Sequence, residues 1–142
     1  MKQEISIESL QPLVVQNLQE HGYLHPVLFI CGSDEEACMV TPEGQDTLLR
    51  ESYINVIIEL VKKKEAYKII FVSEGTMWRE GEEGKQEKIY QIVELTKTET
   101  NAVVQPFKEK KGKIVFTKKP IHTTEGEHIL LKSVQNALIV LQ

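Results

Sequence analysis

The sequence predicts an α+β fold: a mostly antiparallel sheet of about five or six strands, with a long amphipathic helix packed on one face and helices at both ends. Two observations predict this fold. Most apolar segments that resemble strands follow one another through short polar turns, which favours antiparallel hairpins. In addition, residues 46–64 carry apolar side chains at helical spacing. The 142 residues are expected to form a single domain, since such a chain can bury roughly 70% of its unfolded surface.

The first element is predicted to be a helix from about Leu10 to His21. Ser9 is expected to cap its start and Gly22 to end it. Pro12 is expected in the first turn, where a missing N–H costs little. The apolar stripe that predicts the helix consists of Leu10, Leu13, Val14 and Leu18.

A hairpin is predicted next, from Val27–Cys31 and Ala37–Thr41, with a turn between them. Its spacing could bring Cys31 and Cys38 opposite each other, so a cross-strand disulfide is conceivable. Free thiols are favoured instead, because the cytosol is reducing. Cys31 and Cys38 are the only cysteines, and no C-x-x-C pair or suitably spaced histidines complete a zinc site, so no metal ligands are predicted.

The long helix is expected to follow Asp46, whose side chain can cap it. Three lysines, Lys62–Lys64, come at its C-terminal end, where cations complement the helix dipole. The wide apolar stripe that predicts packing on the sheet consists of Leu49, Tyr53, Ile54, Val56, Ile57, Ile58, Leu60 and Val61.

An unbroken apolar run, Ile69–Val72, predicts a strand that is covered on both faces. The polar segment Ser73–Glu87 is predicted to be a long loop. An alternating segment, Ile89–Leu95, is expected to form the next strand.

Two later strands, Ala102–Lys108 and Lys113–Lys118, are predicted to form a hairpin around Gly112. Pro106 cannot donate to a strand ladder, so its strand is expected at an edge or with a bulge. A capping-box pattern at Thr124–Glu127 predicts a final helix, although the tail Leu138–Leu141 is also compatible with a strand.

The segment Ser73–Glu87 is the candidate site, because compact domains usually join strands through fewer residues. If the flanking strands pair directly, Glu74 and Glu87 lie opposite each other at its mouth. Two such carboxylates could hold a divalent cation or divide acid and base roles. The favoured interpretation is that both are solvated strand ends, or pair with Arg79 and Lys85 for little energy. Trp78, the only tryptophan, is either a lid over the core or an exposed anchor for a partner.

A strand ending in Ser73-Glu74, followed by Trp78 and by Glu87 before a second strand, resembles a pattern in small, uncharacterised microbial and phage proteins. The similarity covers about Val27 to Leu95. Three residues separate Glu74 from Trp78, whereas the tryptophan of that family sits closer. The family has no established activity, so the resemblance implies a neighbourhood of folds and no role for any residue.

The segment Lys108–Lys119 is the second candidate, because it carries six lysines and one glutamate. A two-stranded basic ribbon can enter a nucleic-acid groove, with Lys110, Lys111 and Lys113 as contacts. Lysines on edge strands also prevent edge-to-edge aggregation. This second interpretation is favoured, since the ribbon has no arginine for bidentate base contacts and the net charge is −4.

A non-catalytic binding or regulatory module is the predicted function, in the cytoplasm because no signal peptide or membrane span is present. The partner is expected to be a second copy of the chain or an unidentified protein. A second copy could associate through the acidic loop Ser73–Glu87 and the oppositely charged lysine ribbon Lys108–Lys119. One alternative is a small, metal-assisted hydrolase that uses Glu74 and Glu87. A weaker alternative is nucleic-acid binding through Lys108–Lys119. No cofactor is predicted, because nucleotide-binding motifs are absent.

Overall fold

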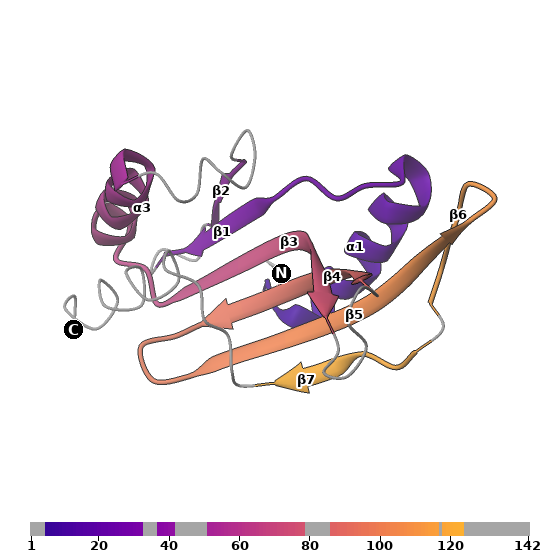
Figure 1. The fold of residues 1–142 in the computed structure, drawn as a ribbon. Coiled ribbons are helices and arrows are strands. Elements are labelled where there is room, and N and C mark those ends of the chain that lie inside the picture. Colours follow the sequence, from indigo (N-terminus) through magenta and orange to yellow (C-terminus); the bar gives the residue numbers. More distant parts are fainter. Residues whose placement is uncertain (1–4, 33–36, 42–50, 79–85, 117, 124–142) are drawn as a thin grey trace.

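The part of the chain that the structure describes is a seven-stranded sheet with a helix on each face (Figure 1). The computed structural model describes residues 5–32, 37–41, 51–78, 86–116 and 118–123. The strand order is β2–β1–β3–β4–β5–β6, and β7 also pairs with β5. Every pairing in this part is antiparallel, so the predicted α+β fold with a mostly antiparallel sheet is confirmed.

Nine elements make up this part of the chain. The helices are α1 (Ile7–His21) and α3 (Glu51–Lys64). The strands are β1 (Val27–Cys31), β2 (Ala37–Val40), β3 (Lys68–Trp78), β4 (Gln86–Leu95), β5 (Thr100–Lys110), β6 (Lys113–Val115) and β7 (Ile121–Thr123). The last of these strands was not predicted. Neither helix is long and apolar enough to cross a membrane, as judged on the described residues.

Helix α1 begins earlier than its apolar stripe predicts. Ser6 is the N-cap, and Ser9 lies within the first turn, where the two serines form a reciprocal capping box. The prediction that Ser9 is the cap is therefore wrong. Pro12 consequently lies beyond the first turn, so its missing N–H removes a helical hydrogen bond. Gly22 ends the helix as predicted, in the left-handed conformation with φ 77°.

The central strand β3 separates two apolar cores. Side chains alternate along a strand, so Ile69 and Phe71 face α3, whereas Ile70 and Val72 face α1. All four side chains are buried. The prediction that Ile69–Val72 is covered on both faces is confirmed.

Helix α3 packs on one face of the sheet through Ile57 and Val61, which are fully buried among residues of β1, β3 and β4. This burial follows the predicted stripe in part, because Val56 of the same stripe is 54% exposed. The beginning of the predicted helix, after Asp46, lies outside the described residues, as does the segment Thr124–Leu141. The full length of the helix that contains α3, and the existence of a helix after Thr124, therefore stay predictions.

The hairpin of β5 and β6 turns at Lys111 and Gly112, which both have positive φ values of 52° and 77°. Two consecutive residues of this kind form the tight turn that suits the twist of paired strands. Pro106 lies on β5 between the residues that pair with β7 and those that pair with β6. The prediction that this strand lies at an edge is wrong, because β6 and β7 both pair with β5 on its outer side; Pro106 instead lies in the gap between these two pairings, where no described strand needs an N–H donor.

Candidate functional site

Glu74 and Glu87 belong to paired strands but do not lie opposite each other. Strand β3 continues to Trp78 and β4 begins at Gln86, so both ends of the predicted loop are strand. Glu74 pairs with Tyr90, and Glu87 pairs with Met77. The two glutamates also differ in face, since neighbouring residues of a strand alternate. The prediction of two facing carboxylates is wrong, because the strands are longer than their apolar runs.

Glu74 lies on the face of the sheet that α1 covers, beside Tyr90. Partial burial raises the pKa of the Glu74 carboxyl, and the charge of Lys88 opposes this rise. Burial likewise raises the pKa of the Tyr90 hydroxyl, and a hydrogen bond with the side chain of Gln11 opposes it. Lys88 also approaches Glu109, with 3.9 Å between Nζ and Oε2. Glu74 is therefore one member of a mixed polar group at the rim of the α1 core.

The aromatic side chains beside this polar group pack edge to face. The ring of Phe116 meets Tyr90 at 6.2 Å between centroids and Phe107 at 6.5 Å. Both partners belong to the core under α1. Tyr90 is therefore held in place on two sides, by Phe116 and by Gln11.

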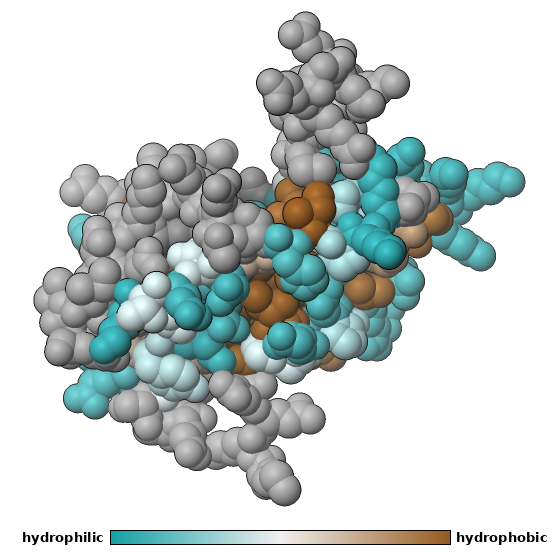
Figure 2. Space-filling model, turned by 90° about the horizontal axis from the view of Figure 1, so that it is seen from below, coloured by the Kyte–Doolittle hydropathy of each residue, from teal (hydrophilic) through white to brown (hydrophobic). Residues whose placement is uncertain are grey.

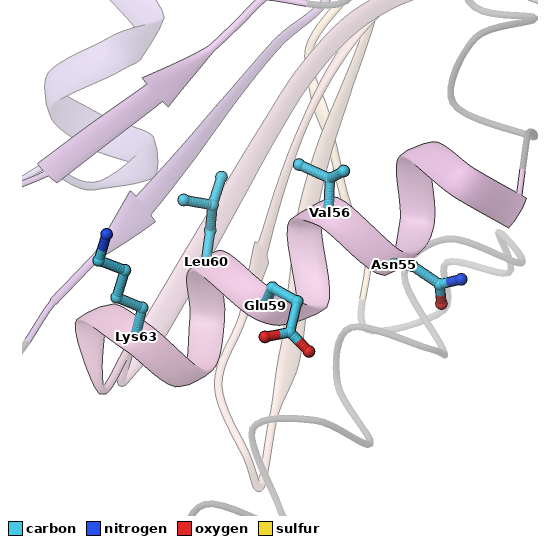
Figure 3. Close-up of a pocket in the computed structure, with 5 residues that line it drawn as sticks. All are labelled: Asn55, Val56, Glu59, Leu60 and Lys63. Atoms are coloured by element: carbon cyan, nitrogen blue, oxygen red, sulfur yellow. The ribbon is translucent and has the colours of Figure 1, made fainter.

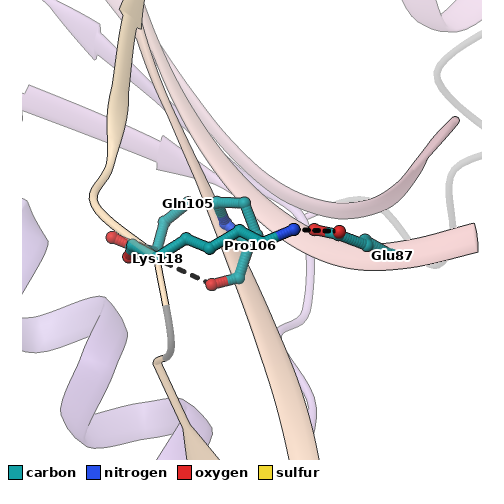
Figure 4. Close-up of polar contacts among 4 residues, drawn as sticks. All are labelled: Glu87, Gln105, Pro106 and Lys118. Carbon is teal, nitrogen blue, oxygen red and sulfur yellow. Dashed lines mark hydrogen bonds and ion pairs between the residues drawn. The ribbon is translucent and has the colours of Figure 1, made fainter. Parts of the chain in front are cut away.

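Glu87 forms an ion pair with Lys118 (Figure 4). The Lys118 side chain reaches across β5 at Pro106 to meet Glu87 on β4. The side-chain amide of Gln105 donates to the carbonyl oxygens of Pro106 (2.9 Å) and Lys118 (2.8 Å). These bonds satisfy main-chain acceptors at a place where β5 has no strand partner on its outer side. Glu87 therefore takes part in an ion pair that connects β4 with the segment leading to β7.

Sequence reasoning did not single out Gln91, which forms a partly buried polar pair with Ser73, a residue named only for the family resemblance. The two residues are direct partners across β3 and β4, and the Gln91 amide donates to the Ser73 hydroxyl at 2.9 Å. Gln11, Lys88 and Gln105 were missed as well. Apart from Pro106, which follows Gln105 directly, their partners come from distant segments of the chain, so no local pattern indicates them.

The other predicted binding residues are described only in part. Trp78 is the last residue of β3, but its side chain lies outside the described residues, as does Arg79 altogether. The two predictions for Trp78, lid or anchor, therefore stay open. Lys110, Lys111 and Lys113 all lie at the exposed tip of the β5–β6 hairpin, as predicted.

Cys31 and Cys38 are free thiols on opposite faces of the hairpin. Cys38 pairs with Ile30, and Cys31 pairs with Ala37, so the cysteines are offset by one position. This offset excludes the conceivable disulfide and confirms the favoured prediction. Across the described ranges, no three His, Cys, Asp or Glu side chains cluster in a way that could hold a metal ion.

A hollow of about 340 Å³ lies along one side of α3 (Figure 3). The helix lines it with Asn55, Val56, Glu59, Leu60 and Lys63. Its titratable groups on α3 are a single acid and a single base, at successive turns of the helix. Such a lining offers apolar contact and few convergent polar groups, so it does not resemble a catalytic cleft.

The two ends of the sheet differ in how their edges are protected. At one end, β2 carries only Ala37, Cys38, Met39 and Val40, with no lysine or proline. At the other end, β6 and β7 are three residues each, and Lys113, Lys118, Lys119 and Pro120 lie in or beside them. Short strands, lysine and proline are common means of blocking edge pairing. Among the described residues, the β2 edge therefore carries fewer of these features than the opposite edge.

Some apolar surface remains on the protected side. Figure 2 views the molecule from below, the side on which β7 lies in Figure 1, and shows hydrophobic residues gathered among hydrophilic ones. Ile121 of β7 is among the exposed large apolar side chains. Single exposed apolar residues are normal in folded proteins, so Ile121 alone indicates no interface.

Comparison of the chain with models of protein families, with curated proteins and with solved structures found no match. No relative therefore supplies a role for any of these residues.

Proposed function

We propose that this protein is a non-catalytic binding module that pairs a strand of a protein partner with the free edge of β2. The observation that carries this proposal is the exposed, uncharged edge strand. Strand β2 has β1 on one side and no described strand on the other. Met39 is 62% exposed, the largest value among the exposed large apolar side chains. An edge of this kind supplies main-chain hydrogen bonds to an added strand, and its side chains add contact area.

The non-catalytic part of the proposal is supported by the separation of the candidate catalytic groups. Glu74 faces α1 among partly buried side chains, whereas Glu87 pairs with Lys118 on the other face. A division of acid and base roles requires two groups within reach of one substrate. The hydrolase alternative would therefore depend on one glutamate alone.

The proposal places the protein in the cytoplasm and requires no cofactor. Free thiols such as Cys31 and Cys38 persist in a reducing compartment.

The same proposal includes a long α3 that continues back to Asp46 and a helix after Thr124. Both helices would cover the sheet and leave β2 as the edge for binding.

The test is affinity capture from a lysate with three forms of the protein. Met39→Lys adds a charge to the β2 edge, as natural edge strands do to block pairing. Leu13→Lys makes the same kind of change on α1 at a side chain that is 59% exposed. A protein partner should be captured by the wild type and by Leu13→Lys and lost by Met39→Lys. A partner that all three forms retain would contradict binding at β2.

Nucleic-acid binding through the Lys108–Lys119 hairpin is a second candidate. It is favoured by one observation: Lys110, Lys111 and Lys113 are all exposed at the tip of a tight turn. Phosphate contacts made by lysine weaken steeply with salt. Retention on DNA or RNA that falls with salt, and that disappears when these three lysines become glutamate, would support this candidate. Equal retention of the triple variant would reject it.

A further inference from the structure

The hydrogen-bonding groups on the free edge of β2 can be assigned from the opposite side of the hairpin. The carbonyl oxygen of Cys31 accepts from the N–H of Tyr67 at 3.0 Å, so the main-chain groups of Cys31 point toward β3. Successive residues of a strand point to alternate sides, which turns those of Ile30 toward β2. Cys38 pairs with Ile30, so the main-chain groups of Cys38 point toward β1. The N–H and C=O groups of Ala37 and Met39 consequently point to the open edge.

Pro106 leads to the same assignment from the far end of the sheet. A proline in a strand must turn its N toward an unpaired side, and its carbonyl accepts from the Gln105 side chain at 2.9 Å. Pro106 therefore points away from β4. Alternation along each strand and the pairing registers of the sheet carry this direction across β4, β3 and β1 to β2. They again leave Ala37 and Met39 facing outward.

We infer that the strand bound at this edge is β2 of a second copy of this chain, in an antiparallel arrangement centred on Cys38. This inference rests on the proposed use of the β2 edge. The outward residues are two positions apart, so a dyad at Cys38 places Ala37 opposite Met39 of the second copy, and Met39 opposite Ala37. All outward donors and acceptors of both residues are then paired, in four hydrogen bonds. The four-residue strand is thus complementary to itself.

The side chains of β2 are compatible with a second copy. None of the four carries a charge, so the paired strands bring no like charges together. The dyad is perpendicular to the sheet, so both α3 helices lie on the same face of one continuous sheet. The net charge of −4 on each copy opposes association at low ionic strength. Salt screens this repulsion, and we therefore expect dimers to strengthen as salt rises.

The dyad gives Cys38 a distinctive neighbour, which provides the test. Cys38 faces Cys38 of the second copy in a non-hydrogen-bonded pair, where Cα atoms are about 4.5 Å apart. This separation lies within the range for a disulfide. In a Cys31→Ser background, diamide takes up two protons and two electrons from the two thiols. A disulfide-linked dimer should form, and a Cys38→Ser variant should form none.

Sedimentation of the same protein over a concentration series measures the association itself. Met39→Lys should weaken the dimer by about tenfold or more, the ratio that follows from about 1.4 kcal/mol of lost contact. Leu13→Lys should leave the dimer constant unchanged. If Met39→Lys does not fold, Ala37→Lys alters the same edge at another exposed position.

A monomer at all concentrations, or a dimer that neither links through Cys38 nor responds to Met39→Lys, would overturn the inference. The proposed function is judged separately by lysate capture. A monomer that captures a protein partner through β2 would retain the binding module and reject only the second copy as its occupant. A monomer that captures nothing through β2 would reject both.

Discussion

Lys118 forms an ion pair with Glu87 even though β5 lies between the segment of Lys118 and strand β4. The Glu87 side chain is 16% exposed and that of Lys118 is 35% exposed. The contact therefore joins the chain leading to β7 with the middle of the sheet. Gln105 strengthens this connection by donating to the carbonyl of Lys118.

Lys118→Met should lower the free energy of unfolding by about 1–2 kcal/mol, because it leaves the mostly buried Glu87 carboxylate without this cation. Chemical denaturation followed by circular dichroism measures the change. Lys119→Met is the matched control, since the neighbouring lysine is exposed, and a surface change of this kind stays within about 0.5 kcal/mol. Equal losses in the two variants would show that the ion pair contributes nothing.

Gly22→Ala should destabilise the protein by about 1–2 kcal/mol, because residues with a Cβ resist the left-handed conformation of this helix cap. No atom lies within 4 Å of an added Cβ, so the loss reflects backbone strain alone. Gly75→Ala is the control, since its Cβ would meet only the Ile89 side chain at 3.8 Å. Thermal unfolding should give a lower midpoint for Gly22→Ala than for Gly75→Ala, and the reverse order would contradict the role of the cap.

Glu74→Gln should gain stability relative to the wild type as pH rises. Burial raises the pKa of Glu74 in the folded state, so the folded protein binds this proton more tightly than the unfolded chain. The resulting stabilisation is complete below the unfolded pKa and is lost as pH rises through the folded pKa. Denaturation at pH 3 and pH 7 compares the two proteins. The free energy of unfolding of Glu74→Gln, minus that of the wild type, should be larger at pH 7 than at pH 3. A smaller value at pH 7 would contradict the raised pKa of Glu74.

Lys88→Met provides a second check on Glu74. The positive charge of Lys88 lowers the pKa of Glu74, against the rise that burial causes. Without this charge, the pKa of Glu74 should therefore rise further. A titration of the Glu74 carboxyl followed by NMR should show this displacement. An unchanged titration would mean that Lys88 does not influence Glu74.

Cys38 should react with a thiol reagent in the native protein well before Cys31 does. Cys31 is buried, whereas Cys38 is partly exposed on the edge strand, and reactivity requires access to the reagent. Mass spectrometry after brief labelling identifies the modified residue. In denaturant both cysteines should react alike, and preferential labelling of Cys31 in the native state would contradict the burial of β1.

The features that sequence reasoning predicted correctly depend on neighbours along the chain. Gly22 ends α1 because a glycine tolerates positive φ, and Gly112 allows the β5–β6 turn for the same reason. The run Ile69–Val72 is apolar at every position, which indicates burial on both faces without knowledge of the partners. Most antiparallel pairings follow from short connections between strands, whereas β1 and β3 pair across the long connection that contains β2 and α3.

The candidate site depended on strand length and pairing register, which the amino-acid sequence does not state directly. Glu74 and Glu87 looked like the two ends of a loop, but strand length and register place them on different faces. A shift of one residue in register reverses the face of every side chain, and packing against α1 and α3 decides it. The partners Lys118 and Gln11 come from distant segments for the same reason. By itself, the sequence determined the local caps, turns and buried runs, because these depend on adjacent residues. Only the tertiary structure decided which charges meet and which described strand ends the sheet, because those relations depend on how the strands are ordered in space.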